Sequence, residues 1–359
     1  MKKQKYYRID KIKKINADYN ILLGERSNGK SFAVGEELLI NAWEKDMHFA
    51  FMRRWQTEVR PVKIEKYFED KYNRIFDITN GECNCIQVRR EEIFFAFNDG
   101  ESIHNVKKCG EVMYLSGYVH FKSLSYPKVT DLIFEEFVPE DGIYLGEDEV
   151  DQLMSLVSTI ARRRRIRVWM IANTISRMCP YFTEWQLKNI PKQKQGTIDT
   201  YEYESPDQFE EDGSHVIITI AVEFCENSGN NSKMFFGNKA SMITNGAWKC
   251  KATPRLPHLY REYDIVYGIY VRYADLSYNM ELLQYKSDNS YMIYVYPAKK
   301  QKYRRCIQSK LSSDIMTTDK LYQLTIGDKY LLSYLKLNKI AYSDNLTGSE
   351  FEEILNKIL

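Results

Sequence analysis

The sequence predicts an α/β protein of two domains joined by a smaller segment. In the first half of the chain, short apolar runs of strand length alternate with stretches of helical or irregular pattern. A glycine-rich turn stands between the first strand and the first helix. A second series of strands begins in the last third, and the 359 residues exceed the roughly 250 to 300 that one hydrophobic core supports.

The composition is that of an ordinary globular protein. Apolar residues make up 44% of the chain, and no apolar run approaches the roughly 18 residues of a membrane span. Lysines open the chain without a following apolar stretch, so we expect no secretory signal, no membrane partner and an intracellular location. Seven cysteines and five histidines lack metal-ligand spacing, so we expect no metal beyond one that a nucleotide brings.

In the first domain, a strand at 19–23 is followed by the glycine-rich turn and a helix from residue 30 to about residue 43. Four further apolar runs are interpreted as strands, at 49–52, 118–121, 132–134 and 168–172. Apolar residues at 150, 153, 154, 157 and 160 follow the helical period, which predicts an amphipathic helix before the last of these strands.

The second half divides into a loose segment and a further α/β domain. Prolines and a polar stretch between 180 and 257 indicate a connecting subdomain. Beyond it, strands are expected at 265–273, 281–285 and 291–296, and helices near 329–337 and 350–359. The predicted domains are therefore 1–180, 181–257 and 258–359.

The glycine-rich turn matches the phosphate-loop (P-loop) pattern G-x-x-x-x-G-K-[ST] and stands where that loop works, between a strand and a helix. Glycines let the backbone wrap a phosphate, and the helix N-terminus adds its positive dipole end. We expect Lys30 to reach the β- and γ-phosphates of ATP and Ser31 to ligate Mg2+. The alternative is an ordinary turn at a helix start. The expected ATP-binding residues are Gly24, Glu25, Arg26, Ser27, Asn28, Gly29, Lys30 and Ser31.

A P-loop enzyme needs a second, acidic element on a neighbouring strand. The apolar run 132–134 ends in Glu135 and Glu136. In this pattern the first acid faces the metal and the second faces the γ-phosphate. We therefore expect Glu135 to help hold Mg2+ and Glu136 to act as the catalytic base; a solvated acidic strand end is the alternative.

An arginine run follows the amphipathic helix, and a polar residue ends the next strand. Arg162 begins the run, and an arginine presented across a subunit boundary stabilises charge on a transferring phosphoryl group. The alternative is a cation that caps the helix C-terminus. Asn173 ends the strand at 168–172, which suits a sensor of the γ-phosphate, whereas a helix cap is the other reading.

Basic clusters offer contacts to DNA. Arg53 and Arg54 end the second strand, and a lysine- and arginine-rich run occupies 299–305. The formal net charge is only +2, so contact with a polyanion depends on such clusters. Phosphate contacts of this kind bind DNA without reading its sequence, but each cluster can equally be a solvated surface.

Taken together, these residues resemble the DNA-packaging (encapsidation) ATPases of the small short-tailed phages of the phi-twenty-nine type. The resemblance covers roughly residues 19–182. Its segments are Gly24–Ser31, Phe51-Met-Arg-Arg-Trp, Tyr126-Pro, Ile133-Phe-Glu-Glu-Phe, Thr159-Ile-Ala-Arg, Ala172-Asn-Thr and Pro180-Tyr-Phe, in this order.

The resemblance implies an ASCE-type P-loop ATPase domain, a lid or linker subdomain and an RNase H-like domain that has lost its nuclease centre. It implies a ring of subunits, expected to be five, around double-stranded DNA. The partners would be the phage portal (connector) and a packaging RNA, with the protein in the host cytoplasm and transiently docked on the procapsid. Arg162 would act on the neighbouring subunit, and Lys122 resembles a family lysine that communicates across the subunit boundary.

The chain departs from the family pattern at one position, and two further points concern the arginine finger and the second domain. The family has aspartate then glutamate where this chain has Glu135 and Glu136, so the first acid is one methylene longer. The run of arginines also offers Arg163 and Arg164 as alternatives to Arg162. In the second domain, the first strand has acids only at its ends, Asp264 and Asp275, so we expect no nuclease activity.

The leading hypothesis is an ATP-driven DNA translocase that packages a viral genome. A second hypothesis is a cellular P-loop enzyme, either a small-molecule kinase, which would ignore DNA, or a helicase, which would separate its strands. A third is a binding module that uses nucleotide only as a structural switch, for which Glu136→Gln would leave function intact.

Overall fold

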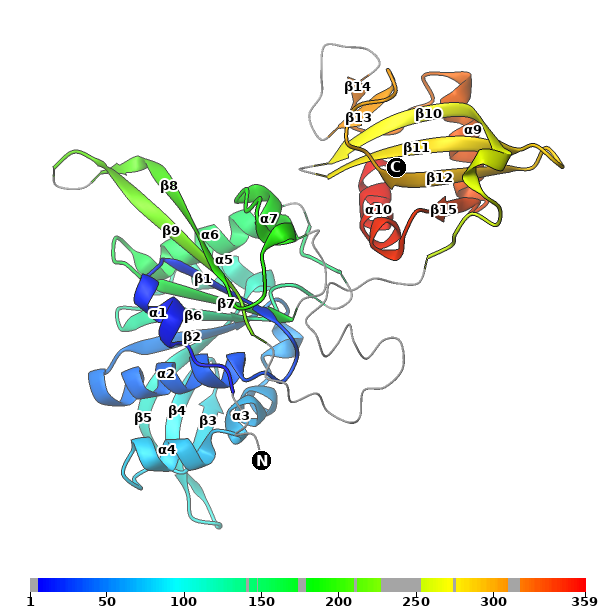
Figure 1. Ribbon diagram of the computed structural model, residues 1–359. Helices are drawn as coiled ribbons and strands as arrows, with labels where there is room; N and C mark the ends of the chain where they lie inside the picture. Colours follow the sequence, from blue (N-terminus) through cyan, green and yellow to red (C-terminus); the bar gives the residue numbers. More distant parts are fainter. Residues whose placement is uncertain are drawn as a thin grey trace. The chain divides into compact units, whose positions relative to one another are not determined.

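The computed structural model describes residues 6–139, 142–146, 148–173, 179–209, 212–226, 253–273, 276–308 and 317–359. The chain divides into two compact units, which among these residues are 6–226 and 253–359 (Figure 1). Each unit combines a β-sheet with helices, which confirms the predicted α/β class.

A nine-stranded sheet forms the centre of the described part of the first unit, in the order β3-β4-β5-β2-β6-β7-β1-β9-β8. Six neighbouring strands, from β5 to β9 in this order, run parallel. β3 and β4 extend one edge and β8 the other by antiparallel pairing. The strands are β1 (Tyr19–Gly24), β2 (His48–Arg53), β3 (Cys85–Arg89), β4 (Glu92–Asn98), β5 (Ile103–Tyr114), β6 (Val129–Glu135), β7 (Arg167–Asn173), β8 (Ile198–Phe209) and β9 (His215–Phe224).

Helices pack against this sheet. Apolar side chains of α1 to α4 join β2, β6 and β7 in one core, whereas α6 packs on β6 and α7 places Tyr181 against Phe134. The described helices of this unit are α1 (Asp10–Ile15), α2 (Lys30–Lys45), α3 (Pro61–Glu69), α4 (Tyr72–Ile78), α5 (Tyr118–Phe121), α6 (Glu149–Ala161) and α7 (Pro180–Glu184).

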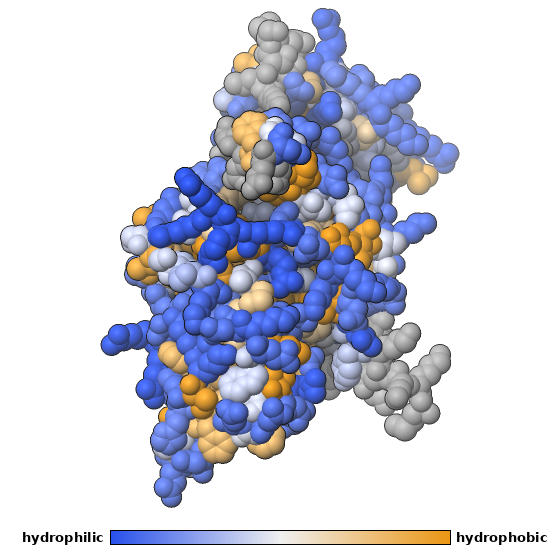
Figure 2. Space-filling model, turned by 90° about the vertical axis from the view of Figure 1, so that its left-hand side faces the viewer, coloured by the Kyte–Doolittle hydropathy of each residue, from blue (hydrophilic) through white to orange (hydrophobic). Residues whose placement is uncertain are grey.

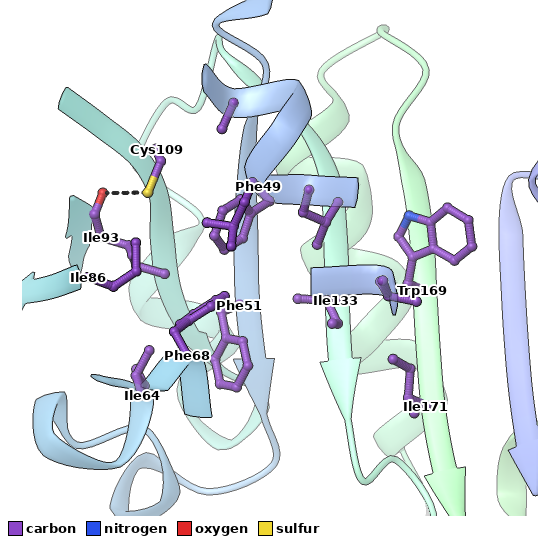
Figure 3. Close-up of a cluster of buried hydrophobic side chains, with 14 of the residues drawn as sticks. Phe49, Phe51, Ile64, Phe68, Ile86, Ile93, Cys109, Ile133, Trp169 and Ile171 are labelled. Atoms are coloured by element: carbon purple, nitrogen blue, oxygen red, sulfur yellow. Dashed lines mark hydrogen bonds between the residues drawn. The ribbon is translucent and has the colours of Figure 1, made fainter. Parts of the chain in front are cut away.

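The core of the first unit combines aromatic and aliphatic side chains. Phe49 and Phe51 of β2 point toward Phe68 of α3, and Trp169 and Ile171 of β7 continue the same layer (Figure 3). Each of these side chains is at most 2% exposed, and burying one such side chain contributes about 1.5–3 kcal/mol. This packing fixes β2, β6 and β7 relative to one another, and these strands carry predicted site residues at their ends.

Most predicted strands and helices of the first unit are present, but one is wrong. The run 118–121 forms the short helix α5 rather than a strand. Phe121 is buried and its ring packs edge-on against Tyr114. The run includes His120 and is too short to show a period, so its sequence alone does not distinguish a helix from a strand.

The predicted linker region contributes to the first sheet. β8 and β9 form a hairpin, and β9 pairs in parallel with β1 from Tyr19↔Ile220 to Leu23↔Phe224. Ile220, Ala221 and Val222 are buried there. Residues 227–252, which contain the polar stretch of the predicted linker, lie outside the described residues, so the division at 181–257 stays a prediction.

The second unit has a six-stranded sheet in its described part, in the order β14-β13-β10-β11-β12-β15. β10, β11 and β12 are antiparallel, and β13, β14 and β15 are added in parallel. Two helices cover the sheet and are capped by Thr325 and Asp344. The elements are β10 (Tyr263–Tyr273), β11 (Leu276–Tyr285), β12 (Tyr291–Pro297), β13 (Cys306–Gln308), β14 (Thr317–Thr318), β15 (Ile340–Tyr342), α9 (Ile326–Lys336) and α10 (Asn345–Ile358).

The prediction of no nuclease activity depends on the first strand of this domain, which has acids only at its ends, Asp264 and Asp275. Asp264 lies exposed near the start of β10, where Lys286 contacts it at 3.4 Å. Asp275 lies outside the described residues. The lack of nuclease activity therefore stays a prediction.

One face of the molecule is mainly polar (Figure 2). The face drawn in Figure 2 is largely hydrophilic, with small separate groups of apolar side chains. Among the described residues, no helix combines the length and the apolar character that crossing a bilayer requires.

Candidate functional site

The P-loop connects β1 to α2 at the carboxyl edge of the sheet. Gly29 is the N-cap of α2 at φ 97°, a conformation that favours glycine. Gly24, at the end of β1, packs so closely on β9 that a Cβ there would lie 3.2 Å from Cβ of Cys225. The N-cap Gly29 has no side chain to cap α2, and the backbone N–H of Lys30 donates to Oδ1 of Asn28 at 3.2 Å. Backbone N–H groups at such a helix start are suited to bind an anion.

Lys30 points into the loop that precedes it. Its ammonium group donates to the Glu25 carbonyl oxygen at 2.7 Å and to Oδ1 of Asn28 at 3.2 Å. The side chain is 4% exposed, and burial lowers the pKa of Lys30. A buried ammonium held only by neutral oxygens in these two bonds is suited to exchange them for a phosphate oxygen.

The P-loop contains a buried hydrogen-bond donor, in the side chain of Asn28, that can still bind an acceptor. Its side chain is 1% exposed, and Nδ2 has no acceptor in the described part of the chain. Buried donors without partners are uncommon in folded proteins. An anionic ligand in the loop fits this observation.

Ser31 and Glu135 lie together although 104 positions separate them. Ser31 Oγ donates to Oε2 of Glu135 at 3.1 Å. The second oxygen, Oε1, accepts from the hydroxyl of Tyr67 at 2.7 Å. Burial raises the pKa of Glu135, whereas these two hydrogen bonds and the charges of Arg53 and Lys71 act in the opposite direction. Hydroxyl and carboxylate oxygens are the ligands that Mg2+ prefers, so this pair fits that ion.

Glu136 follows directly and adopts a left-handed backbone conformation at φ 54°. Its Oε2 accepts from the guanidinium of Arg53 at 2.5 Å, and Arg53 also contacts Glu58 at 3.1 Å. A non-glycine residue held in this region is strained, and such strain concentrates at functional sites. Arg53 therefore binds the predicted catalytic carboxylate, and its contact with DNA stays a prediction.

One cavity of about 830 Å³ connects these groups. Asn173 lines it from the end of β7, where it pairs with Gly24 in the sheet register. Thr174, the polar residue after it, lies outside the described residues. The lining thus includes Lys30, Ser31, Glu135, Glu136 and Asn173, the predicted catalytic, metal and sensor residues other than Arg162.

The segment before α1 closes one wall of the cavity. The backbone N–H of Tyr7 donates to the Asn28 carbonyl oxygen at 2.9 Å, and the Tyr7 hydroxyl donates to Glu223 at 2.7 Å. Tyr6 also lines the cavity, yet 60% of this residue is exposed. A large aromatic ring left open on a cavity wall offers a face on which a nucleotide base can stack.

Arg162 and Lys122 lie away from this cavity. Arg162 ends α6 at φ 43°, is exposed, and donates to the Leu124 carbonyl oxygen at 2.7 Å. Lys122 follows α5, is exposed, and holds its ammonium 4.7 Å from the centre of the Tyr118 ring. Two predicted trans-acting residues therefore occupy one region of the surface, around the 122–124 turn.

The neighbouring arginines differ in how firmly they are held. Arg164 donates to the carbonyl oxygens of residues 126, 127, 129 and 160. Arg163 is exposed and, within the described chain, has no side-chain partner. Among the three candidates for the finger, Arg164 is committed to holding α6 on the 126–129 turn.

Arg54 is buried, whereas the sequence predicts that it contacts DNA. It is 3% exposed and pairs with Glu149 through Nε at 2.9 Å and Nη2 at 2.8 Å. It also donates to the Phe137 carbonyl oxygen at 2.6 Å. Because the guanidinium is enclosed, we correct this assignment: Arg54 anchors the segment after β6 to α6.

The basic run at 299–305 is divided between surface and interior. Lys299, Lys300 and Arg304 are exposed. Lys302 is also exposed, but it bonds the buried Glu281 at 2.8 Å. Arg305, 2% exposed, contacts Asp328 at 3.3 Å. Only part of this run is therefore available to a polyanion.

Sequence reasoning missed Tyr67 and the tyrosines before α1. Tyr67 reaches Glu135 from α3, and no motif in the sequence indicates that this helix contributes to the site. Tyr6 and Tyr7 stand in a lysine-rich stretch, where the doublet of aromatic residues is the only signal.

The fold and the site define the class of this protein. β7, which ends in Asn173, lies between the P-loop strand β1 and the acidic strand β6. The P-loop follows β1 and the two carboxylates lie at the end of β6, so both are at the same edge of the sheet. This arrangement is that of an ASCE-type P-loop ATPase fold.

Comparison with known proteins gives the family. A family model described as the Podovirus DNA encapsidation protein (Gp16) matches residues 1–212, more than half of the chain. The chain belongs to this family. The DNA packaging protein of Bacillus phage phi29 is 26% identical over 212 residues, 58% of this chain and 59% of that protein. That of Bacillus phage B103 is 31% identical over 174 residues, 47% of this chain and 48% of that protein.

A solved structure extends the likeness in fold to the second unit. The bacteriophage Phi-29 viral genome packaging motor assembly contains a chain with a TM-score of 0.57 and 19% identity, and the match covers 99% of both chains. The sequence match, in contrast, spans less than two thirds of the length of the curated relatives. The resemblance stated from the sequence is thereby confirmed.

Proposed function

We propose that this protein is an ATPase that drives double-stranded DNA into a phage procapsid. Membership of the encapsidation family supports the process, and relatives of this chain are named DNA packaging proteins. The observation that carries the proposal is the cavity that joins the P-loop to Glu135, Glu136 and Asn173.

The P-loop residues would bind the triphosphate. Backbone amides at the start of α2 surround the phosphates, and Lys30 exchanges its bonds to Glu25 and Asn28 for the β- and γ-phosphate oxygens. Ser31 and Glu135 would hold Mg2+, which when bound neutralises phosphate charge. Arg26 and Ser27 are exposed at the mouth of the loop and complete its lining.

Glu136 would act as the general base. Its carboxylate accepts a proton from the attacking water once it leaves Arg53, and Asn173 donates to the γ-phosphate from the end of β7. Arg162, exposed at the end of α6 and away from the cavity of its own subunit, suits a role on the nucleotide of a neighbouring subunit. A closed ring supplies such a neighbour to every subunit, and we propose that this ring is a pentamer around DNA.

The remaining assignments follow from the family. Lys122 would take part in communication across the subunit boundary. The partners would be the portal (connector) and a packaging RNA, with the protein in the host cytoplasm and docked on the procapsid during packaging. The relative with a similar fold is described as part of a packaging motor assembly, which supports association with other components.

ATP turnover with and without double-stranded DNA tests the proposal. We expect the intact protein to hydrolyse ATP and DNA to increase the rate. Lys30→Ala should lose at least about 100-fold in rate, because a charge-stabilising group at the phosphates is removed. Lys45→Ala, on the exposed far end of the same helix, is the matched control and should keep the rate.

The same experiment separates the alternatives. Hydrolysis that survives in Lys30→Ala would exclude the P-loop as the site. Turnover that ignores DNA but requires a small acceptor would indicate a kinase, and separation of DNA strands would indicate a helicase. Full function of Glu136→Gln would indicate a nucleotide switch without hydrolysis.

A further inference from the structure

The carboxylate of Glu135 is held from two sides by two different elements. Oε2 accepts from Ser31 Oγ at the start of α2, at 3.1 Å. Oε1 accepts from the hydroxyl of Tyr67 on α3, at 2.7 Å. The Tyr67 hydroxyl also lies 3.1 Å from the Ser31 carbonyl oxygen, so it touches both residues assigned to the metal.

The length of the side chain at position 135 makes this second contact important. Glutamate carries one methylene more than the aspartate of the family pattern, which adds about 1.5 Å of reach and one rotatable bond. Glu135 is only 5% exposed, so solvent does little to fix the carboxylate. The Tyr67 hydroxyl supplies the restraint that the extra rotatable bond otherwise removes.

Tyr67 is itself held firmly. Its ring packs against Phe51 at 4.8 Å and edge-on against Phe68 at 4.9 Å between ring centres. The ammonium of Lys71 lies 4.5 Å above the same ring and bonds Asp70 at 2.8 Å. Gly35 of α2 makes room for Lys71, because a Cβ at Gly35 would lie 2.8 Å from Cε of that lysine.

We propose that Tyr67 is a positioning residue that orients the Glu135 carboxylate toward Ser31 and thereby sets the affinity of this site for Mg2+. The inference rests on the proposed function, since it assigns a role within the nucleotide site. Tyr67 is absent from the lining of the cavity and acts through Glu135. Partners that orient a metal ligand from behind typically contribute about 10- to 100-fold in metal affinity or activity.

The test measures binding of a non-hydrolysable ATP analogue to the full chain by calorimetry at a series of Mg2+ concentrations. Tyr67→Phe removes one oxygen and keeps the ring. We expect it to raise the half-saturating Mg2+ concentration about 10-fold, while binding without Mg2+ stays the same. Tyr72→Phe is the matched control. The Tyr72 hydroxyl lies 3.4 Å from the carbonyl oxygen of Glu65 on α3, the helix that carries Tyr67, and it does not contact Glu135.

A double-mutant cycle distinguishes positioning from packing. Glu135→Asp shortens the side chain, so that the carboxylate no longer reaches both Ser31 and Tyr67. In that background we expect Tyr67→Phe to change the half-saturating Mg2+ concentration less than about twofold, because contacting groups are non-additive. Equal effects in both backgrounds, or an effect no larger than that of Tyr72→Phe, would overturn the inference.

The outcomes also separate this inference from the proposed function. An unaltered protein that binds the analogue with a clear Mg2+ dependence supports the nucleotide site, whatever Tyr67→Phe does. An unaltered protein that binds no analogue, with or without Mg2+, overturns both. Thermal unfolding of Tyr67→Phe at the temperature of the unaltered chain establishes that the variant is folded.

Discussion

At the scale of single residues, the pairing of Arg53 with Glu136 is the most informative contact of the site. The predicted base is bound at 2.5 Å by a guanidinium that comes from the end of β2. A carboxylate engaged in this way is a poor acceptor for a proton from water. The structure therefore captures the site in an arrangement in which Glu136 is restrained.

Replacing Arg53 tests this restraint. We expect Arg53→Ala to raise ATP turnover in the absence of DNA several-fold and to reduce the further increase that DNA causes, because Glu136 is released permanently. The measurement is steady-state turnover with and without DNA. Glu58→Gln, which removes the other acid that Arg53 contacts at 3.1 Å, is the control and should leave DNA stimulation in place. A lower basal rate in Arg53→Ala would mean that Arg53 supports the chemistry instead.

Tyr6 allows a second prediction at this scale. Its exposed ring on the cavity wall is suited to stack on the adenine, and such stacking contributes about 1–3 kcal/mol. We therefore expect Tyr6→Ala to weaken ATP binding about 10-fold and Tyr6→Phe to leave it nearly unchanged. Inorganic tripolyphosphate, which has no base, should bind all three proteins equally. A loss of tripolyphosphate binding in Tyr6→Ala would show that the residue supports the loop rather than the base.

At the scale of elements, the sequence predicts what local pattern controls. The P-loop strand and helix were expected at 19–23 and 30–43, and β1 and α2 occupy Tyr19–Gly24 and Lys30–Lys45. Helix α6 was expected from five apolar positions and spans Glu149–Ala161. Each of these elements carries its own signal in the form of a period or a glycine motif.

Contacts between segments far apart in the chain have no local signal in the sequence. No local pattern indicates that β9 pairs with β1, 201 residues earlier, or that Tyr67 reaches Glu135 across 68 positions. Arg54 is a further example, because a basic residue at a strand end suggests an exposed side chain, and its burial beside Glu149 depends on a residue 95 positions away. The grouping of Lys30, Ser31, Glu135 and Asn173 was predictable because parallel strands bring their carboxyl ends to one edge.

In the second sheet, β11 carries a buried carboxylate that gives a prediction for pH. Glu281 is 0% exposed and accepts hydrogen bonds from Lys302 at 2.8 Å, from Tyr260 and Tyr296 at 2.6 Å each, and from Tyr303. Burial alone raises the pKa of Glu281, but these four donors outweigh it and hold the pKa below the ordinary 4.5. The donors therefore stabilise the folded second unit fully above pH 4.5, and this stability is lost as the pH falls from 4.5 through the lowered pKa.

We expect Glu281→Gln to destabilise the second unit by about 2 kcal/mol at pH 7, because an amide with a single acceptor oxygen replaces the buried carboxylate that accepts these four hydrogen bonds. The variant should also lose the part of the acid sensitivity that comes from this group. Pulse proteolysis in urea at pH 7 and pH 4 measures both, with fragments of residues 253–359 identified by mass. Asp264→Asn, an exposed acid on the neighbouring strand, is the control and should change stability by less than about 0.5 kcal/mol. Equal stability of Glu281→Gln and the unaltered chain at pH 7 would contradict the prediction.

At the scale of the whole molecule, the predicted finger and the nucleotide cavity of one chain lie on separate parts of the first unit. Arg162 donates to the Leu124 carbonyl oxygen beside Lys122 and is absent from the lining of the cavity. This position favours a role of Arg162 on the ATP of another copy. A closed ring of identical subunits with head-to-tail contacts gives every cavity one such neighbour.

Mixing two inactive variants tests this arrangement. Arg162→Ala keeps an intact cavity but offers no finger, whereas Lys30→Ala offers a finger but has a defective cavity. In a ring assembled from equal amounts of both, half of the subunits have an intact cavity and half of their neighbours supply an arginine. We therefore expect turnover per subunit to recover to about a quarter of the unaltered rate, although each variant alone is inactive. Mixing Lys30→Ala with Glu136→Gln is the control, since both changes damage the cavity and no combination restores it. A mixture of Arg162→Ala and Lys30→Ala that stays as inactive as its parts would mean that Arg162 serves the cavity of its own subunit or the structure of the turn it holds.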